Sequence, residues 1–580
     1  MIRAENLRLQ YPTREGYALD GVSFDVDRGE VLGVVGPVEA GKTSLAMALT
    51  GLAPAVTGGT LEGELSVAGR DPRTADSDGR VGMVFEDYSS QLTQVRVIDE
   101  VTVPLLDRGF DRAEARERAR ELLADVRLEG YGDERTWELS GGEQQRVAIA
   151  AVLATDPDVL VFDTATDMLD PHGREDVSNL VASLAGETTM VVTVDDPQDL
   201  VGVADSVLVL EDGEPVTVGD ADSVLRDADC FADVGVEPPL PQRVARDLGL
   251  AADPLSPDEL ADALGDTPAR ERRERLADDG GRPVDTDRAF DGDPVLEADD
   301  VSFAYGPDEQ ALDGIDFAVH AGEVHAVIGG NGAGKTTLSE LLVGLLTPDS
   351  GQLVVDGEPT DGRTAAAVGE DVGLAFQNPD EQLSRRTVED ELRFPLERRQ
   401  YDRSGWLPFG NEKRFGEEYV EERVDRALEL VGLDDAGVRD ADPTKLPQGE
   451  RRLVAIASAL APDPTAAVLD EPTAGLDADG YDRMRDTIGR LADRGKAVVV
   501  VEHDMDFVCD VADRVTLLDD GGVALQGPPR EVFAREHWDA LRERYLRPPR
   551  AARLADRLGV DALTLDGLVD RTRHLAETTP

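Results

Sequence analysis

The stretch VHAVIGGNGAGKTT, residues 324–337, decides the fold. Its first half is an apolar run that predicts a buried strand, and its second half is a glycine-rich turn that leads into a helix. The backbone N–H groups of such a turn can surround phosphate oxygens, and the N-terminus of the helix favours their negative charge. A glycine turn that merely happens to precede Lys-Thr would rarely fall between a strand and a helix. The stretch therefore predicts an α/β core with a phosphate-binding loop, whose expected contact residues are Gly329, Asn331, Gly332, Gly334, Lys335, Thr336 and Thr337.

A second copy of this loop, GPVEAGKTS, lies at residues 36–44. It follows the apolar run VLGVV, and Glu39 replaces the glycine in the middle of the loop. If Glu39 must adopt a positive φ, the cost is about 1–2 kcal/mol, and its carboxylate would lie near polyphosphate. Alternatively, its side chain faces solvent. The sequence leaves open whether this loop binds a nucleotide, for which the candidate residues are Gly36, Gly41, Lys42, Thr43 and Ser44.

The two loops belong to an internal repeat with a period near three hundred residues. Segment 9–36 (LQYPTREGYALDGVSFDVDRGEVLGVVG) matches segment 303–330 (FAYGPDEQALDGIDFAVHAGEVHAVIGG), and apolar–polar alternation in both indicates antiparallel strands. The tails at 238–250 and 548–560 also match, and the segment 266–293 resembles a linker because it is rich in charge, Gly and Asp. The expected organisation is a first domain (1–225) with an extension (226–265), the linker (266–293), and a second domain (294–533) with its own extension (534–580).

The composition bounds the class of protein. The chain of 580 residues has 59 basic and 120 acidic residues, a net charge of -61, which indicates adaptation to high salt because 41% hydrophobic residues argue against disorder. Free nucleic acid is not expected as a ligand. The two cysteines, Cys230 and Cys509, support neither a disulfide framework nor a metal site. No uncharged apolar run reaches about 18 residues and the N-terminus lacks the apolar core of a signal peptide, so membrane association is expected only through partners.

The string LSGGEQQRVAIA, residues 139–150, is the most specific in the chain. This string resembles the signature of ATP-binding cassette ATPases. With the two loops, it makes each half resemble a nucleotide-binding domain of that family. The resemblance implies two α/β domains, each with an antiparallel β region and a helical subdomain, that pair head to tail within the chain. Each ATP would lie between the loop of one domain and the signature of the other, here Ser140, Gly141 and Gly142. The second copy of the signature, LPQGERRLVAIA, has Pro447 and Gln448 instead.

The resemblance assigns further roles in the second half. Gln377 in AFQNPDEQL matches the glutamine that senses Mg²⁺ and the attacking water, and Asp470 in LDEPTAGLD matches the metal-binding aspartate. Glu471 matches the general base. His503 matches the switch histidine; a core or surface histidine is the alternative, but its distance in sequence from Glu471 favours the switch. The resemblance thus implies that ATP and Mg²⁺ bind here, with Thr336, Asp470 and Gln377 as the magnesium ligands.

The first half departs from this pattern at several of the same positions. Glu86 replaces the glutamine, Thr164 the base and Asp195 the histidine, although Asp163 and Thr43 remain as possible Mg²⁺ ligands. Under head-to-tail pairing, all altered residues fall in one composite site and all intact ones in the other. One site is therefore expected to hydrolyse ATP, and the other at most to hold it.

Two tyrosines are candidates for stacking on adenine. Tyr11 and Tyr305 lie 31 and 30 residues before their loop lysines, where the family places an aromatic residue. Buried strand tyrosines are the alternative interpretation.

Within the family, FQNPDEQL followed by TVEDELRFPL resembles the energy-coupling-factor ATPases, which drive uptake of vitamins or of cobalt and nickel ions. The resemblance implies a membrane-embedded coupling subunit, a substrate-binding membrane subunit, and a place at the cytoplasmic face of the membrane. Segment 401–416 lengthens the second helical subdomain and is a candidate contact. A soluble tandem cassette protein acting on ribosomes or DNA is the alternative, but the chain has no cysteine cluster before the first cassette and no long basic linker. Glu471 argues against a third possibility, a purely structural scaffold. The sequence does not name the cargo.

Overall fold

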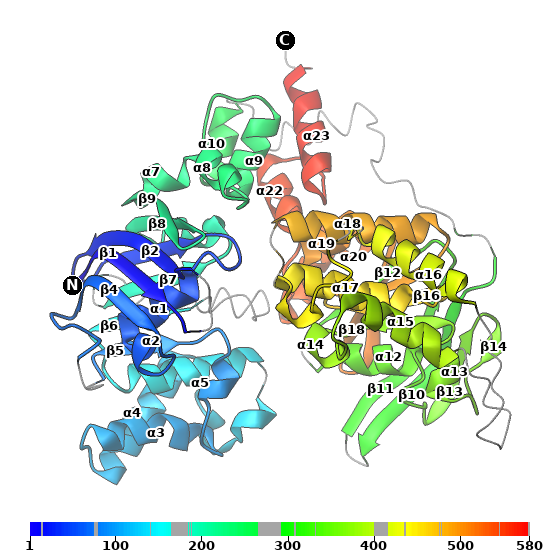
Figure 1. Ribbon diagram of the computed structural model, residues 1–580, viewed down its shortest axis with the longest axis horizontal. Helices are drawn as coiled ribbons and strands as arrows, with labels where there is room; N and C mark the ends of the chain where they lie inside the picture. Colours follow the sequence, from blue (N-terminus) through cyan, green and yellow to red (C-terminus); the bar gives the residue numbers. More distant parts are fainter. Residues whose placement is uncertain are drawn as a thin grey trace. The chain divides into compact units, whose positions relative to one another are not determined.

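The chain forms two compact units, Met1–Pro268 and Ala269–Pro580, whose elements are labelled in Figure 1. The computed structural model describes residues 1–12, 16–74, 79–139, 141–163, 184, 186, 188–264, 290, 292–306, 309–330, 332–399, 416–433, 437–474, 476, 478–544 and 546–577. Across these residues, no helix is both long and apolar enough to span a bilayer. Most of the predicted linker and nearly all of segment 401–416 lie outside the described residues.

A small antiparallel sheet begins the first unit. Its strand order is β2-β1-β4, and Ile2 lies opposite Val26 on one side and Val67 on the other. Apolar residues of these strands, such as Leu7 and Leu9, are buried because one face of the sheet packs on the core. The predicted antiparallel strands are thus confirmed, with the bounds β1 (Ile2–Gln10), β2 (Leu19–Val26) and β4 (Thr60–Val67).

The second sheet of this unit is mostly parallel and carries the first loop. Its order is β5-β6-β7-β3-β8-β9, with only β9 antiparallel. All five residues of β3 are buried, as the apolar run predicts, and the phosphate loop follows its end. The strands are β3 (Val31–Val35), β5 (Val81–Val84), β6 (Val159–Phe162), β7 (Thr189–Val194), β8 (Ser206–Glu211) and β9 (Glu214–Asp220).

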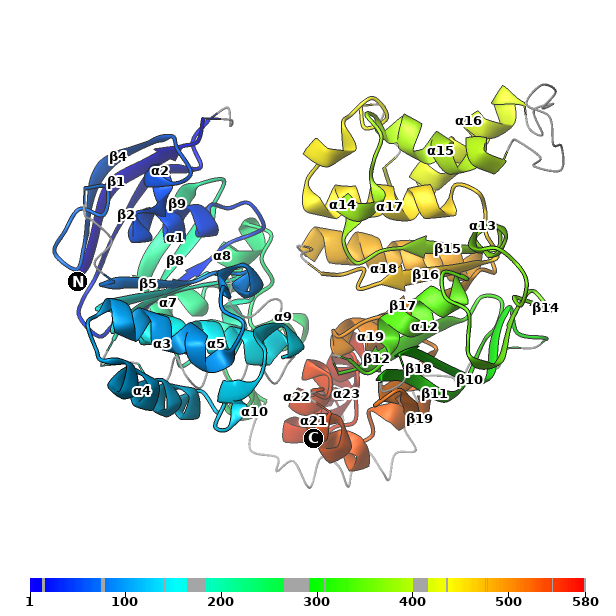
Figure 2. The ribbon, with the colours of Figure 1, turned by 90° about the horizontal axis from the view of Figure 1, so that it is seen from below.

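The helices of the first unit fall into three groups. One follows the loop, a second forms a helical subdomain in which α3, α4 and α5 contact one another beside β5 (Figure 2), and a third forms the C-terminal extension. They are α1 (Lys42–Thr50), α2 (Leu52–Ala55), η1 (Tyr88–Gln91), α3 (Val97–Asp107), α4 (Arg112–Asp125), η2 (Tyr131–Asp133), η3 (Thr136–Glu138), α5 (Gly141–Leu153), η4 (Pro197–Leu200), α7 (Ala221–Leu225), α8 (Ala228–Asp233), α9 (Leu240–Asp247) and α10 (Pro257–Ala263).

The second unit repeats both sheets. The antiparallel sheet has the order β11-β10-β13-β14, and the mostly parallel sheet has the order β15-β16-β17-β12-β18-β19. The loop-bearing strand β12 again lies between two parallel neighbours. The strands are β10 (Leu296–Gly306), β11 (Glu309–Val319), β12 (Val324–Gly329), β13 (Ser350–Val355), β14 (Glu358–Pro359), β15 (Val372–Ala375), β16 (Ala466–Asp470), β17 (Ala497–Val501), β18 (Arg514–Asp519) and β19 (Gly522–Gly527).

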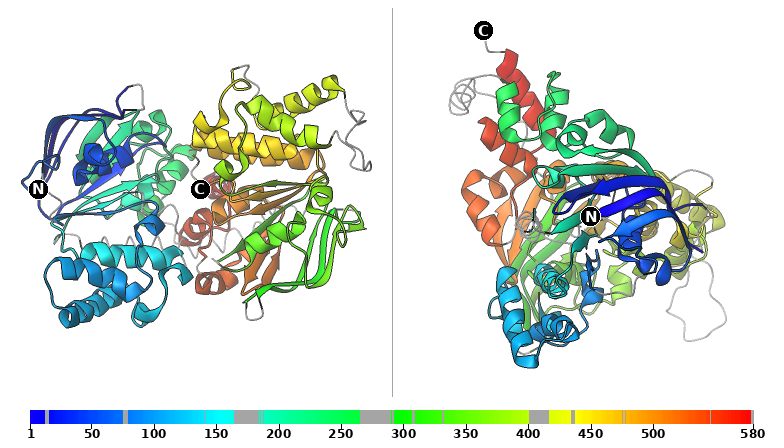
Figure 3. Two further views of the ribbon diagram at one scale, coloured as in Figure 1. Left: turned by 60° about the horizontal axis from the view of Figure 1, so that its bottom comes forward. Right: turned by 90° about the vertical axis from the view of Figure 1, so that its left-hand side faces the viewer.

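The helices of the second unit follow the same plan. In its C-terminal extension, α22 contacts α19, and the red helices lie against the orange part of the unit in Figure 3. The helices are α12 (Lys335–Leu342), α13 (Ala365–Val368), α14 (Pro379–Gln382), α15 (Val388–Arg399), α16 (Glu417–Leu430), η5 (Pro443–Lys445), α17 (Gln448–Leu460), α18 (Ala478–Asp493), α19 (Met505–Val511), α20 (Pro529–Val532), η6 (Arg535–His537), α21 (Trp538–Glu543), α22 (Arg550–Leu558) and α23 (Leu565–Glu577).

Candidate active site

The phosphate loop of the second unit connects β12 to α12. Gly334 has a φ of 101°, and a Cβ atom there would lie 2.7 Å from the carbonyl oxygen of Ala311 and 2.5 Å from Leu312, so only glycine fits. The Nζ of Lys335 donates to the carbonyl oxygens of Gly329 (2.8 Å) and Gly330 (3.0 Å). These bonds hold the ammonium across the mouth of the loop, where terminal phosphates are expected. Asn331 lies outside the described residues.

The loop of the first unit has the same backbone form. The Nζ of Lys42 donates to the carbonyl oxygens of Gly36 (2.7 Å) and Pro37 (2.8 Å), which are the equivalent contacts. Glu39 has a φ of 65°, and Gly332 at the same position of the other loop has 77°. Glu39 is also exposed. The loop therefore imposes the left-handed conformation, at a cost of about 1–2 kcal/mol for a residue with a side chain.

Three of the predicted catalytic residues meet in the second unit. The Nε2 of Gln377 donates to the Oε2 of Glu471 over 2.6 Å, and the Nδ1 of His503 lies 3.7 Å from the Oε1 of Glu471. Glu471 has a φ of 44°, a strained conformation of the kind that clusters at functional sites. Burial, and then the neighbouring Glu471, raise the pKa of Asp470 to about 6. Asp470 and Glu471 thus follow β16 as an adjacent carboxylate pair beside an amide and an imidazole.

Sequence reasoning missed Arg452, which supports this cluster. The side chain lies on α17 and is 4% exposed. Its Nη2 donates to the carbonyl oxygen of Gln377 over 2.8 Å, and its Nη1 donates to that of Glu471. Burial lowers the pKa of Arg452. One guanidinium therefore joins the two segments that carry Gln377 and Glu471. No sequence pattern indicates this role of Arg452.

Glu502 was also missed. It is fully buried and accepts hydrogen bonds from the backbone N–H groups of Thr473 (3.1 Å) and His503 (2.8 Å). The hydroxyl of Thr473 donates to it as well. Glu502 therefore connects the segment after Glu471 to His503. The available signal was a carboxylate directly after the apolar run VVVV at residues 498–501.

The corresponding place in the first unit has different chemistry. Asp163, which is 1% exposed, accepts from the hydroxyls of Thr43 (3.2 Å) and Thr193 (3.1 Å), and burial raises its pKa. Asp195 forms an ion pair of 2.7 Å with Lys42. Burial, and then the charges of Asp163 and Asp195, raise the pKa of Glu86. Thr164 lies outside the described residues.

The two candidate tyrosines both reach the helix that follows their loop. The hydroxyl of Tyr11 donates to Ser44 over 3.3 Å, and the half-buried ring packs on the core. The hydroxyl of Tyr305 lies 3.2 Å from that of Thr337, and 54% of the residue is exposed. Tyr305 thus presents a ring that could stack on adenine, whereas Tyr11 also fits the alternative of a partly buried tyrosine.

The two signature segments each begin a helix. In the first unit, α5 begins at Gly141, and a Cβ atom at Gly142 would meet nothing within 4 Å. Ser140 lies outside the described residues. In the second unit, α17 begins at Gln448 after Pro447. Proline lacks the N–H and the hydroxyl that serine offers to a phosphate.

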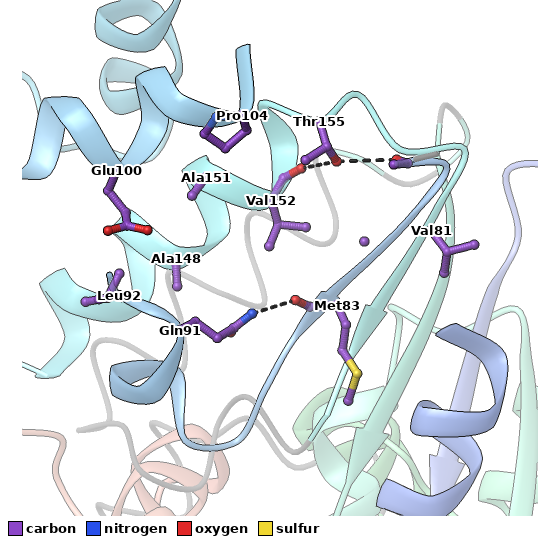
Figure 4. A pocket seen from close by; sticks show the side chains of 12 residues that line it. Val81, Met83, Gln91, Leu92, Glu100, Pro104, Ala148, Ala151, Val152 and Thr155 are labelled. Atoms are coloured by element: carbon purple, nitrogen blue, oxygen red, sulfur yellow. Dashed lines mark hydrogen bonds between the residues drawn. The ribbon is translucent and has the colours of Figure 1, made fainter. Parts of the chain in front are cut away.

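A cavity of about 300 Å³ lies in the first unit, between β5 and the helices α3 and α5 (Figure 4). The Nε2 of Gln91 donates to the carbonyl oxygen of Met83 at its wall. Glu100 also lines it, but its carboxylate accepts from the N–H groups of Thr93 and Gln94. The cavity does not include the phosphate loop. Its lining consists of Gly79, Val81, Gly82, Met83, Gln91, Leu92, Glu100, Pro104, Ala148, Ala151, Val152 and Thr155.

No group of three or more His, Cys, Asp or Glu side chains in the described ranges is arranged to hold a metal ion. Mg²⁺ that accompanies a nucleotide commonly uses one or two protein oxygens together with phosphate oxygens and water. The pairing of Thr43 with Asp163 offers two such oxygens, and the donor types fit magnesium.

Comparison with known proteins resolves the family. The profile described as ABC transporter matches residues 19–167 and 312–474, which together are more than half of the chain. The chain belongs to the ABC transporter family. It contains two ATP-binding cassettes, binds ATP, and is an ATPase coupled to transport.

Two similar proteins match nearly the whole chain, and one solved structure matches less than half of it. A protein of Caldanaerobacter subterraneus subsp. tengcongensis, described as an ABC transporter ATP-binding protein, is 33% identical over 96% of this chain and 96% of its own length. One from Methanosarcina acetivorans is 31% identical over 100% of this chain and 94% of its own length. The solved structure of cbiO1 from Clostridium perfringens, described as part of the ABC transporter complex cbiONQ, is 32% identical. It covers 43% of this chain and 94% of cbiO1, with a TM-score of 0.37.

Proposed function

We propose that the chain is the ATP-hydrolysing energy-coupling subunit of an importer for a vitamin or a transition-metal ion. One ATP site, built on Lys335, hydrolyses ATP, and the other, built on Lys42, does not. The contact between Gln377 and Glu471 carries this proposal, because it places a general base beside an amide that can orient the attacking water. The equivalent place in the first unit has the ion pair of Lys42 with Asp195 instead.

The residues of the second unit support the following chemistry. Glu471 accepts a proton from the water that attacks the terminal phosphate, while Gln377 orients that water. His503 lies close enough to Glu471 to sense the same phosphate. Bound Mg²⁺ would supply neutralisation of phosphate charge; Thr336, Asp470 and Gln377 would hold it here, and Thr43 and Asp163 would do so in the first unit.

The sorting of intact and altered motifs supports head-to-tail pairing of the cassettes. The first unit keeps the signature Ser140–Gly142 but lacks the base, and the second keeps the base but has Pro447 in its signature. If Ser140 serves the nucleotide held by Lys335, the intact signature and the base belong to one site, and every altered residue belongs to the other. Independent loss in each cassette would not produce this division.

The membrane partners of this proposal are a coupling subunit and a substrate-binding subunit, with the chain bound peripherally at the cytoplasmic face. Large apolar side chains on the helical subdomain of the first unit support a protein contact there. Five such residues of the described surface are 37–59% exposed: Val95, Val103, Leu106, Tyr131 and Trp137. The relatives named above are ABC transporter proteins, and none of them favours the alternative role on ribosomes or DNA.

Steady-state ATP hydrolysis tests the catalytic part. With the membrane subunits present and in molar salt, Glu471→Gln should lower the rate by ~10²-fold or more, because a general base contributes 10²–10⁴. Glu429→Gln, an exposed residue of α16, is the matched control. A Glu471→Gln rate above about a tenth of the parent rate contradicts the proposal.

Co-purification and uptake test the partners. Expressed with membrane proteins encoded beside it, the chain should co-purify with them in detergent, and Val103→Asp with Leu106→Asp should weaken that association. A substrate-dependent uptake assay would then identify the cargo. Co-purification with ribosomes would instead support the alternative.

A further inference from the structure

We propose that the first nucleotide site prefers nucleoside diphosphates over triphosphates, because the carboxylate of Asp195 takes the place of the terminal phosphate on Lys42. The inference rests on the proposed function, in which this site does not hydrolyse ATP. It goes further by naming the class of ligand that the site retains.

The hydrogen bonds of Lys42 are the first observation. A lysine ammonium has three N–H donors. Lys42 donates to the carbonyl oxygens of Gly36 (2.7 Å) and Pro37 (2.8 Å), and its Nζ forms an ion pair with the Oδ1 of Asp195 over 2.7 Å. Lys42 is only 7% exposed. A third phosphate that approaches this ammonium must therefore displace Asp195.

The second unit has a histidine, His503, at the position of Asp195 beside an equivalent loop lysine. Lys335 makes the two equivalent carbonyl contacts. The imidazole of His503 lies 3.7 Å from Glu471, and it can donate a hydrogen bond to a phosphate oxygen. A carboxylate can only accept one. The single change from histidine to aspartate thus reverses the response of this position to a terminal phosphate.

The charges around Lys42 act in the same direction. Asp163, Asp195 and Glu86 lie close enough to influence one another, and Lys42 is the cation that offsets them. A triphosphate brings one more negatively charged phosphate than a diphosphate into these acidic surroundings, where Lys42 already pairs with Asp195. The penalty falls on the third phosphate.

A diphosphate avoids this conflict. The loop N–H groups and the N-terminus of α1 are donors for the first two phosphates in addition to the lysine, so a diphosphate retains partners while Asp195 pairs with Lys42. The left-handed backbone at Glu39 matches that of Gly332, so the loop keeps the shape that encloses these phosphates. The site is therefore suited to hold a diphosphate while the other site turns over.

The test is equilibrium binding to the full chain carrying Lys335→Ala, which removes nucleotide binding at the second site. ADP and a non-hydrolysable ATP analogue are titrated by calorimetry with Mg²⁺ in molar KCl. ADP should bind at least about tenfold more tightly. Asp195→Asn should reduce that ratio to about threefold or less by tightening the ATP analogue. Glu121→Gln, which removes one charge from the exposed side of α4, should leave the ratio unchanged.

Asp195→His, which installs the residue of the second unit, repeats the test if the asparagine variant does not fold. Equal or tighter binding of the ATP analogue overturns the inference, as does a ratio that neither variant changes. Failure of both nucleotides to bind overturns it too. The hydrolysis assay on Glu471→Gln is measured separately, so a failure of the proposed function would be seen there and not in the binding ratio.

Discussion

The two cassettes share a backbone and differ in the polar groups that would handle a phosphate. In each, the loop lysine donates to two equivalent carbonyl oxygens. In each, a glutamine side chain accepts from the backbone N–H of the residue before the catalytic position, Gln91 from Phe85 and Gln382 from Phe376. These contacts are kept although the first unit has Glu86 where the second has Gln377.

The differences extend beyond the reacting groups. Where the second unit has Arg452, the first has the buried Gln145, and where the second has Glu502, the first has Val194. In the second unit, Arg452 binds the segment that carries Gln377, and Glu502 binds the segment that carries His503. The first unit therefore lacks both the predicted catalytic residues and the residues that support them, and Thr164→Glu alone should recover little activity.

The largest expected effect tests whether residues of the two units act on the same nucleotide. Ser140→Arg and Lys335→Ala should each lower ATP turnover by about a hundredfold, and the double variant should be little worse than either single one. If the cassettes pair head to tail as proposed, the signature and the loop act on one phosphate. A double-mutant cycle on the hydrolysis rate measures the coupling. Coupling of Ser140 to Lys42 in place of Lys335 would refute the arrangement.

The next prediction exchanges a supporting residue between the cassettes. Arg452→Gln gives the second unit the residue of the first and removes two hydrogen bonds that position Gln377 and Glu471. We expect kcat to fall about tenfold to a hundredfold with little change in KM, because small displacements of reacting groups are costly. Arg452→Lys should not restore the rate, since lysine cannot span both carbonyls as the planar guanidinium does. An unchanged kcat would show that Arg452 serves only packing.

A smaller effect concerns His325, which is buried in β12 where the first unit has Leu32. Its ring nitrogens lie 3.2 Å from Glu323 and 2.8 Å from Thr516, Arg514 faces the same carboxylate, and burial lowers the pKa of His325. Below about pH 6.5 the unfolded chain takes up a proton that the folded chain resists, so stability is lost as the pH falls.

His325→Leu should therefore reduce the loss of thermal stability between about pH 7.5 and 5.5, by roughly 1 kcal/mol. Differential scanning calorimetry in molar salt measures this difference, with the parent chain as reference. The comparison uses the change between the two pH values, because Glu323 loses a partner at both. An unchanged acid sensitivity would exclude His325 as its source.

The smallest effect lies in the C-terminal extensions. Asp506 accepts from the backbone N–H of Arg550 (2.7 Å) and from its Nε (2.8 Å), and so caps α22. In the first unit the matching residues are Gln198 and Leu240. Asp506→Ala should destabilise the docking of α22 by about 1 kcal/mol. Limited proteolysis should then cut faster between α21 and α22, while Gln198→Ala leaves the first extension unaffected.

The sequence predicted the elements well and the contacts between them less well. Apolar runs and glycine spacing indicated β3, β12 and both loops, and the family motifs pointed to Gln377, Glu471 and His503, which do lie together. The pairing of Lys42 with Asp195 joins residues 153 positions apart, and no local pattern reports such a contact. The same holds for Arg452, because helical periodicity does not distinguish a buried arginine from an exposed one. The roles of Ser140, Asn331 and Thr164, the domain boundaries and head-to-tail pairing stay predictions.

The position of β3 has a consequence for how the chain folds during synthesis. Val31 pairs with Met190 on one side, and Leu32 pairs with Ser206 on the other, so the central strand must wait for partners made much later. Such distant pairings close slowly. In the second unit Val324 waits in the same way for Val498. All strands of the mostly parallel sheet of the first unit nevertheless precede residue 221. That sheet can therefore be complete before β12 leaves the ribosome. Two sheets of such similar sequence would otherwise compete for each other's strands, and the order of synthesis keeps them apart.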